Sequence, residues 1–500
     1  MSETTTAPTA TPTSTTHFDV LIVGAGISGI GAAYHLGTEC PDKSYVILES
    51  MDSFGGTWKT HTYPGIRSDS DLFTFGYKFK PWKDAPIASA DKILAYMNEV
   101  IDENDLGQHI RYGHLIETAS WSSEDNLWTI SATQRDSGEK VQFTANFLWM
   151  CQGYYRHSKG HTPDWPGMDD YAGEIIHPQT WPDDADMTGK NVIVIGSGAT
   201  AATLVPAIAA DVDHVTVLQR SPTYFFPGEN TNELADTLRE LDIPDEWTHE
   251  IVRQKILKDQ HDLTQLCIDY PELAREELLN GVRELLPEGY DVEKHFGPRY
   301  RPWQQRIAFV PDGDIFAGIS SGKASMVTDE IETFTEKGIL TKSGEQLEAD
   351  VIITATGFDL CVLGDIAFSV DGNPVDFADT VTYRGMMFTG VPNMVWVFGY
   401  FRASWTLRAD LVSDFVCRLL HHMDEAGVAR VLPTLRSQDA DMELLPWLDG
   451  DNFNPGYMTR SMHLMPKCGE KHQWQHSQNY WVEKEELPLA DLDDGCLVYD

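Results

Sequence analysis

The chain has few basic residues for its length. Its 500 residues include 37 Lys and Arg against 77 Asp and Glu, which gives a formal net charge of −40. A field of that sign repels nucleic acid and anionic lipid, so we expect neither as a partner. Any phosphate-bearing ligand must therefore be held by local groups, such as helix N-termini and a few well-placed arginines.

Paired cysteines are also lacking, because the seven cysteines are widely spaced and no CxxC occurs. That pattern indicates a reducing, cytoplasmic location and argues against a metal site or a redox-active dithiol. Residues 1–16 are mostly Thr, Ala, Pro and Ser, without the basic start and apolar core of a signal peptide, and we expect a disordered tail. The longest uncharged stretch, between Arg384 and Arg402, is interrupted by glycines and a proline, so we predict buried strands and no transmembrane segment.

One pattern occurs twice: a β-branched run, a glycine-rich turn and an alanine-rich helix, first near Phe18 and again near Asn191. Two such openings predict an α/β protein with two Rossmann-like dinucleotide-binding domains. Between Asn230 and Leu286 the sequence changes to Leu, Glu, Asp and Lys at helical spacing, which indicates a helical insertion in the second domain. The expected boundaries are a tail at 1–16, a first domain at 17–160 and 357–500, a second domain at 161–225 and 299–356, and the insertion at 226–298.

The first glycine turn follows a strand that ends at Val23 and contains Gly24, Gly26 and Gly29 in a GxGxxG pattern. These glycines permit a tight turn, close approach to a pyrophosphate and close helix–strand packing. The next strand ends in Glu49, whose carboxylate can accept hydrogen bonds from both hydroxyls of an unphosphorylated ribose. The position near the N-terminus favours FAD over NAD. The alternative is a glycine-rich turn that binds no ligand.

The second glycine turn has the pattern GxGxxA, with Gly196, Gly198, Ala199 and Thr200 at the turn and the start of the helix. Here the carboxylate position holds Gln219, and Arg220 and Ser221 follow. A guanidinium and a hydroxyl suit a 2′-phosphate, which a carboxylate would repel, so we predict NADPH at this turn. The alternative for Arg220 is a solvated surface arginine.

One diol site and one ribose-phosphate site in the same chain predict hydride transfer from NADPH to a flavin. A disulfide reductase would need a cysteine pair close in sequence, and the chain has none. The reduced flavin must then pass its electrons to an external acceptor or to O2.

Three further motifs resemble those of the Baeyer–Villiger monooxygenases, within the wider group of flavin monooxygenases. The family's FxGxxxHxxxW motif appears with Tyr in place of the opening Phe, and a GGxWxxxxYPGxxxD motif and an ATG segment are intact. The ethionamide-activating subgroup is the most similar, through the Pro302–Arg306 and Ser404–Leu407 stretches. The motif residues are Tyr171, Gly173, His177 and Trp181 for the first, Gly56, Thr57, Trp58 and Asp69 within the second, and Ala355-Thr356-Gly357 for the third.

The resemblance implies an enzyme that inserts one oxygen atom of O2 into a ketone or aldehyde, giving an ester or lactone, and also oxidises sulfides. It implies that Arg306 stabilises negative charge beside the flavin, that Asp69 orients this arginine, and that His177 serves positioning. It also implies that Gln305 stands where other members carry Lys, and we expect the insertion to rotate with the second domain.

Duller alternatives remain for these residues: a structural ion pair for Arg306, a turn for Asp69 and a loop histidine for His177. For the whole chain the alternatives are a heteroatom oxygenase without carbonyl activity and a non-catalytic FAD and NADPH redox sensor. The sequence does not predict an oligomeric state.

Overall fold

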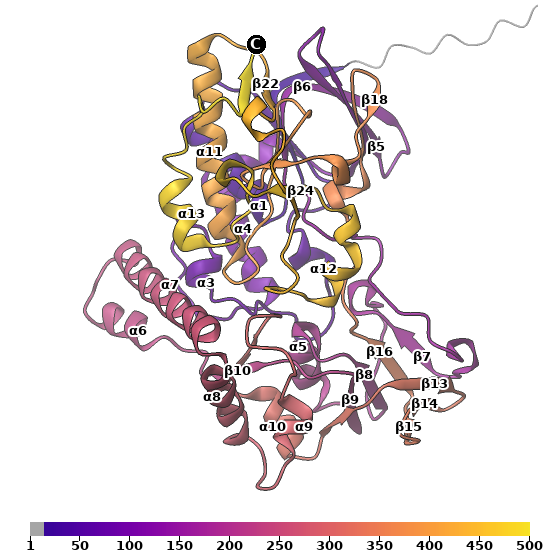
Figure 1. Ribbon diagram of the computed structural model, residues 1–500. Coiled ribbons are helices and arrows are strands. Elements are labelled where there is room, and N and C mark those ends of the chain that lie inside the picture. The colour runs from indigo at the N-terminus through magenta and orange to yellow at the C-terminus, as the bar shows by residue number, and fades with distance from the viewer. Residues whose placement is uncertain (1–14) are drawn as a thin grey trace, which may run out of the picture.

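The computed structural model describes residues 15–500, which form two large β-sheets and five smaller ones, with helices packed around them (Figure 1). The first strand already begins at Thr16, so the expected tail over 1–16 is too long by at least that residue. The rest of that tail, residues 1–14, lies outside the described residues.

The larger sheet has nine strands in the order β18-β17-β4-β5-β6-β1-β2-β3, with β21 also paired to β6. Its parallel part joins β6, β1, β2 and β3, as the first glycine turn requires. Helices α1 (Ile27–Glu39) and α11 (Trp405–Ala426) pack against each other and bury apolar residues against this sheet. The strands are β1 (Thr16–Val23), β2 (Tyr45–Leu48), β3 (Ile110–Arg111), β4 (His114–Ser122), β5 (Leu127–Gln134), β6 (Lys140–Met150), β17 (Ala367–Val370), β18 (Asn373–Pro374) and β21 (Met394–Trp396).

The second sheet is entirely parallel, in the order β12-β9-β8-β16-β7, and lies in the lower half of Figure 1. Its strands are largely apolar because both faces are covered: helices α5 (Ala199–Ile208) and α10 (Asp314–Ser320) pack on one face, and Phe334, Ile339 and Leu347 pack on the other. The strands are β7 (Glu174–Ile176), β8 (Asn191–Ile195), β9 (His214–Gln219), β12 (Ala324–Thr328) and β16 (Val351–Thr354).

The other elements are small. They are the strands β10 (Phe225–Gly228), β11 (Ala308–Pro311), β13 (Ile331–Thr335), β14 (Gly338–Thr341), β15 (Gln346–Glu348), β19 (Thr382–Tyr383), β20 (Met387–Phe388), β22 (Val431–Pro433), β23 (Leu444–Pro446), β24 (Lys467–Gly469) and β25 (Leu497–Tyr499), and the helices α2 (Thr57–Thr60), α3 (Leu72–Phe75), α4 (Ala90–Glu103), α12 (Gly456–Ser461) and α13 (Tyr480–Glu486).

Two connecting segments run between the sheets and bond to each other. The amide of Arg156 donates to the carbonyl of Asp359 at 2.8 Å, and the amide of His161 donates to that of Gly357 at 3.0 Å. We call the part of the chain built around the larger sheet the first half and the part built around the second sheet the second half. The chain therefore leaves and re-enters the first half through one paired connection.

The helical insertion consists of α6 (Glu233–Glu240), α7 (Asp245–Asp269), α8 (Pro271–Arg283) and α9 (Val292–Phe296). Its helices divide between the two halves: α8 and α9 contribute to the core of the second sheet, whereas α6 and α7 contribute to the core of the first. A rotation of the whole insertion with the second domain would therefore have to break the contacts of α6 and α7 with the first sheet, and that expectation stays a prediction.

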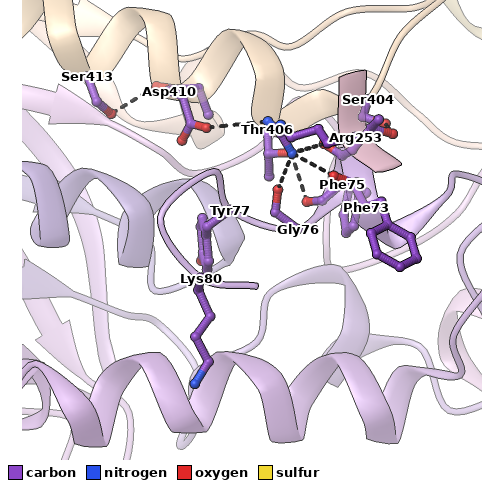
Figure 2. A network of polar contacts seen from close by, with 12 residues as sticks. Phe73, Phe75, Gly76, Tyr77, Lys80, Arg253, Ser404, Thr406, Asp410 and Ser413 are labelled. Carbon is purple, nitrogen blue, oxygen red and sulfur yellow. Dashed lines mark hydrogen bonds and ion pairs between the residues drawn. The ribbon is translucent and has the colours of Figure 1, made fainter. Parts of the chain in front are cut away.

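Arg253 explains why α7 belongs with the first half. Its side chain is 3% exposed, and Nη1 donates to the carbonyls of Phe73, Thr74 and Gly76 at 2.8, 3.2 and 3.1 Å (Figure 2). Asp410 of α11 lies 3.9 Å from Nη2. A buried guanidinium held by carbonyls of α3 and a carboxylate of α11 is costly to extract, so it fixes α7 to those helices.

Within residues 15–500, no helix combines the length and the apolar character needed to cross a membrane. All seven cysteines are buried and none forms a disulfide.

Candidate active site

The first glycine turn leaves no room for side chains. Gly24 has φ +97°, and a Cβ there would lie 2.9 Å from the carbonyl oxygen of Cys151. A Cβ on Gly29 would collide with the carbonyl oxygen of Gly24. Gly26 instead faces Gly56 of the second motif, and no side chain caps the helix that Gly26 begins. The free amides at the start of α1 can therefore bind a pyrophosphate.

Glu49 lies at the end of β2 and is 6% exposed. Its Oε2 accepts the amide of Ala25 at 2.7 Å and its Oε1 accepts the amide of Met51 at 2.8 Å. The carboxylate is thus held beside the glycine turn, where it can also accept ribose hydroxyls. The Gly56-Thr57-Trp58 turn packs next to the glycine turn, at Gly26. The hydroxyls of Thr57 and Tyr155 form a hydrogen bond of 2.7 Å. These residues fit FAD.

The second turn repeats the geometry with more open space. Gly196 has φ +112°, and a Cβ there would collide with the carbonyl oxygen of Ala355. A Cβ on Gly198 would meet nothing within 4 Å. Helix α5 then starts at Ala199 and Thr200 without a side-chain cap, so its first amides are available to a phosphate.

Gln219 ends β9 and is 2% exposed. Its Nε2 donates to the carbonyl of His295 at 2.7 Å and to the Thr328 hydroxyl at 2.9 Å, while its buried Oε1 has no hydrogen-bond partner among the described residues. Arg220 and Ser221 follow on the exposed surface. A polar, positively charged edge of this kind suits a ribose phosphate.

Arg460 of α12 was not singled out from the sequence. Its Nη2 donates to the carbonyl of Phe358 at 3.4 Å, next to the paired connection. Burial lowers the pKa of Arg460, Asp359 raises it, and the positive charge of nearby Arg220 lowers it further. Two like charges facing the same edge of the second sheet favour an anionic ligand between them. No local motif marks Arg460, because only the fold brings α12 to this edge.

Asp69 and Arg306 meet across the boundary between the two halves. The Nη2 of Arg306 lies 2.9 Å from both carboxylate oxygens of Asp69. The Asp69 carboxylate raises the pKa of Arg306 above its ordinary value, so the guanidinium stays charged. Its buried Nε has no hydrogen-bond partner among the described residues, which leaves a donor for a ligand.

Aromatic side chains connect this pair to the first glycine turn. Tyr154 lies near Arg306 and stacks on Trp405, with ring centroids 5.2 Å apart. The indole nitrogen of Trp405 donates to the hydroxyl of Ser28, inside the GxGxxG turn, at 2.8 Å. Tyr457 also lies near Arg306, and its ring centroid is 6.3 Å from that of Tyr154. Two aromatic side chains, Tyr154 and Trp405, therefore link Arg306 to the first glycine turn, and neither Tyr154 nor Tyr457 was indicated by a sequence motif.

The signature motif lies on the second sheet and reaches the connection between the two halves at His177. The Tyr171 hydroxyl donates to the carbonyl of Ala349 at 3.0 Å, and Gly173 packs against the backbone of Asp350. His177 packs directly on Gly160, where a Cβ would collide with the imidazole ring. Burial lowers the pKa of His177. A neutral histidine at this place fits the expected positioning role.

Trp181 of the signature motif and the neighbouring-motif residue Gln305 differ in what they contact. Trp181 packs on the core of the second sheet. The Nε2 of Gln305 lies 3.4 Å from the side-chain oxygen of Asn454, so Gln305 is directed toward the C-terminal segment.

Three comparisons agree with this geometry. Residues 18–227 match the model of the family described as flavin-binding monooxygenase-like. The FAD-containing monooxygenase EthA of Mycolicibacterium smegmatis is 47% identical over 487 residues, covering 97% of each chain.

Among solved structures, an oxidized steroid monooxygenase bound to NADP matches with a TM-score of 0.76 at 22% identity, covering 97% of this chain and 99% of that one. The open form of cyclohexanone monooxygenase matches with a TM-score of 0.69 at 23% identity, covering 84% and 90%. The structural matches show the fold, with its two nucleotide-binding domains. The similarity to EthA over 97% of each chain shows the family. By its sequence over nearly its whole length, this chain belongs to the flavin-binding monooxygenase-like family, as an enzyme of the FAD-containing monooxygenase type.

Proposed function

We propose that this protein is an NADPH- and FAD-dependent Baeyer–Villiger monooxygenase. It inserts one oxygen atom of O2 into ketones or aldehydes, giving esters or lactones, and it also oxidises sulfides. The observation that carries the proposal is the Asp69–Arg306 pair, which the stacked rings of Tyr154 and Trp405 link to the first glycine turn.

The two glycine turns support the cofactor assignment. Gly24, Gly26 and Gly29, with Glu49, would hold FAD, and a second set, with Arg220 as its charged member, would hold NADPH. That second set is Gly196, Gly198, Ala199, Thr200, Arg220, Ser221 and Arg460. The bound flavin supplies two-electron reduction by NADPH and reaction with O2.

Arg306 does the electrostatic part of the work. A fixed guanidinium stabilises the negative charge that develops on a carbonyl oxygen under attack, and it needs no reorganisation to do so. Asp69 holds Nη2 through both its oxygens, so the charged plane cannot turn away, and Nε remains free to donate. Tyr154 and Tyr457 lie beside it, while its side chain remains 40% exposed, which leaves room for a substrate.

The cellular setting follows from composition. We propose a cytoplasmic protein, in keeping with seven unpaired buried thiols, and small organic substrates as the partners besides O2.

A product screen with isotopically labelled O2 tests the proposal. We expect the flavin-loaded protein to convert members of a ketone panel to esters that carry one labelled oxygen, and members of a sulfide panel to labelled sulfoxides. Labelled sulfoxides without any ester would favour the heteroatom oxygenase. No labelled product, with both nucleotides bound, would favour the redox sensor.

A further inference from the structure

The segment Tyr63–Asp69 belongs to the first half by its backbone. The amide of Ser68 donates to the carbonyl of Ala88 at 2.9 Å, and the amide of Ala90 donates to that of Ile66 at 3.1 Å. These bonds make an extended ladder with the residues that lead into α4. The segment therefore moves with α4 and the first sheet.

Its apolar side chains belong to the second half. Tyr63 is 7% exposed and, with Ile66, packs in the core that surrounds the second sheet. The hydroxyl of Tyr63 lies 3.4 Å from the hydroxyl of Thr203 on α5. Gly65 has φ +77°, and a Cβ there would lie 2.5 Å from the carbonyl oxygen of Thr203. Only glycine allows the segment to approach α5 this closely.

Two ion pairs of opposite polarity attach the segment to residues that flank strand β11. Arg67 lies 2.6 Å from Asp314, and Asp69 lies 2.9 Å from Arg306. Arg67 also donates to the carbonyl of Ala202 on α5 at 3.4 Å. Residues two apart in an extended segment face the same way, which explains why both pairs reach across one boundary.

The two partners in the second half lie at opposite ends of β11. Arg306 precedes that strand and Asp314 follows it, as the first residue of α10. One ion pair alone would allow the segment to pivot about Asp69, whereas two pairs fix its position and its direction. The side chains of Arg67 and Asp314 are only 18% and 28% exposed, so solvent screens this pair less than a fully exposed one.

We propose that Arg67 is a positioning residue. By pairing with Asp314 it fixes the orientation of the Tyr63–Asp69 segment against β11, and thereby the direction in which Asp69 holds the Arg306 guanidinium. Its effect on oxygen insertion rests on the proposed function. Its effect on domain docking does not.

Hydrogen–deuterium exchange of the flavin-loaded enzyme tests the docking directly. In Arg67→Met and Asp314→Asn we expect amides of residues 63–75 to exchange about tenfold faster than in the wild type, while those of α7 are unchanged. Arg430→Met is the matched control, because Arg430 is similarly buried and pairs with Asp500 away from the boundary.

Coupling of NADPH oxidation to product tests the positioning. The ratio of product to NADPH consumed does not depend on the fraction of protein that folds or binds flavin. We expect it to fall about fivefold to tenfold in Arg67→Met, to stay unchanged in Arg430→Met, and to recover in the charge swap Arg67→Asp with Asp314→Arg.

Unchanged exchange over residues 63–75 would overturn the docking role, and an unchanged product ratio in Arg67→Met would overturn the positioning role. If the wild type gives no oxygenated product at all, the proposed function fails, and the exchange result alone then decides whether Arg67 docks the two halves.

Discussion

The two dinucleotide folds begin with the same strand, glycine turn and helix, yet they differ at the residue that ends the second strand. Glu49 is buried and accepts the amides of Ala25 and Met51, so its charge is fixed beside the first turn. Gln219 is buried just as deeply but is neutral, and the charge at that edge comes from the exposed Arg220. The diol and phosphate selectivities that we propose for the two folds therefore depend on this single position and its neighbour.

The glycines give the largest expected difference between the two folds. Gly29→Ala should abolish flavin binding, because the added Cβ collides with the carbonyl of Gly24. Gly198→Ala should leave a yellow, folded protein, since its Cβ meets no protein atom within 4 Å, but raise the KM for NADPH about tenfold by crowding the pyrophosphate. Flavin absorbance and steady-state kinetics check both, and a colourless Gly198→Ala protein would contradict the comparison.

The phosphate-binding edge gives the next largest effect. Arg220→Ala should raise the KM for NADPH roughly tenfold to thirtyfold and leave the KM for NADH unchanged, because a charge-assisted hydrogen bond to the 2′-phosphate is lost. Arg460→Ala should show the same preference change to a smaller extent. Equal losses with both coenzymes would mean that these arginines support the fold and do not select the phosphate.

Helices α1 and α5, which follow the two glycine turns, give the smallest expected difference, in how the free energy of unfolding depends on pH. Burial lowers the pKa of His35 on α1, but the nearby carboxylates of Asp410, at 3.7 Å, and Glu39, in a hydrogen bond of 2.7 Å, outweigh it and raise the pKa to about 9. Because the folded pKa exceeds the unfolded value of about 6.5, this contribution is complete below that pH and is lost as the pH rises through about 9. Helix α5 contains no titratable side chain.

Urea unfolding between about pH 6 and pH 10 measures the effect. The wild type should lose on the order of 1–2 kcal/mol across this range, after allowance for the partly exposed carboxylates, and His35→Gln should lose less. Parallel curves for the two proteins would contradict it.

Local patterns in the sequence predicted the nucleotide folds well. The strand β8 begins at Asn191, where the second occurrence of the pattern was predicted, because apolar runs that end at a glycine turn are set by short-range constraints. The meeting of Asp69 and Arg306 was predicted from the family resemblance, since 237 residues separate them and no local rule links them.

The attachment of the helical insertion could not be predicted in the same way. Arg253 lies in a helix rich in charged residues and resembles a solvated arginine, yet it is buried (Figure 2). Its acceptors are carbonyls of Phe73, Thr74 and Gly76, at least 177 residues away, and main-chain acceptors leave no trace in the sequence. Tyr154, Tyr457 and Arg460 were missed because the residues they contact lie far away in the sequence.

The central claim is that the Arg306 guanidinium supports oxygen insertion beside the flavin. The most direct test measures ester formed per NADPH oxidised in flavin-loaded wild type and Arg306→Ala. We expect the ratio to fall at least about a hundredfold in the variant while NADPH oxidation and O2 uptake continue. An unchanged ester yield in Arg306→Ala would contradict the account.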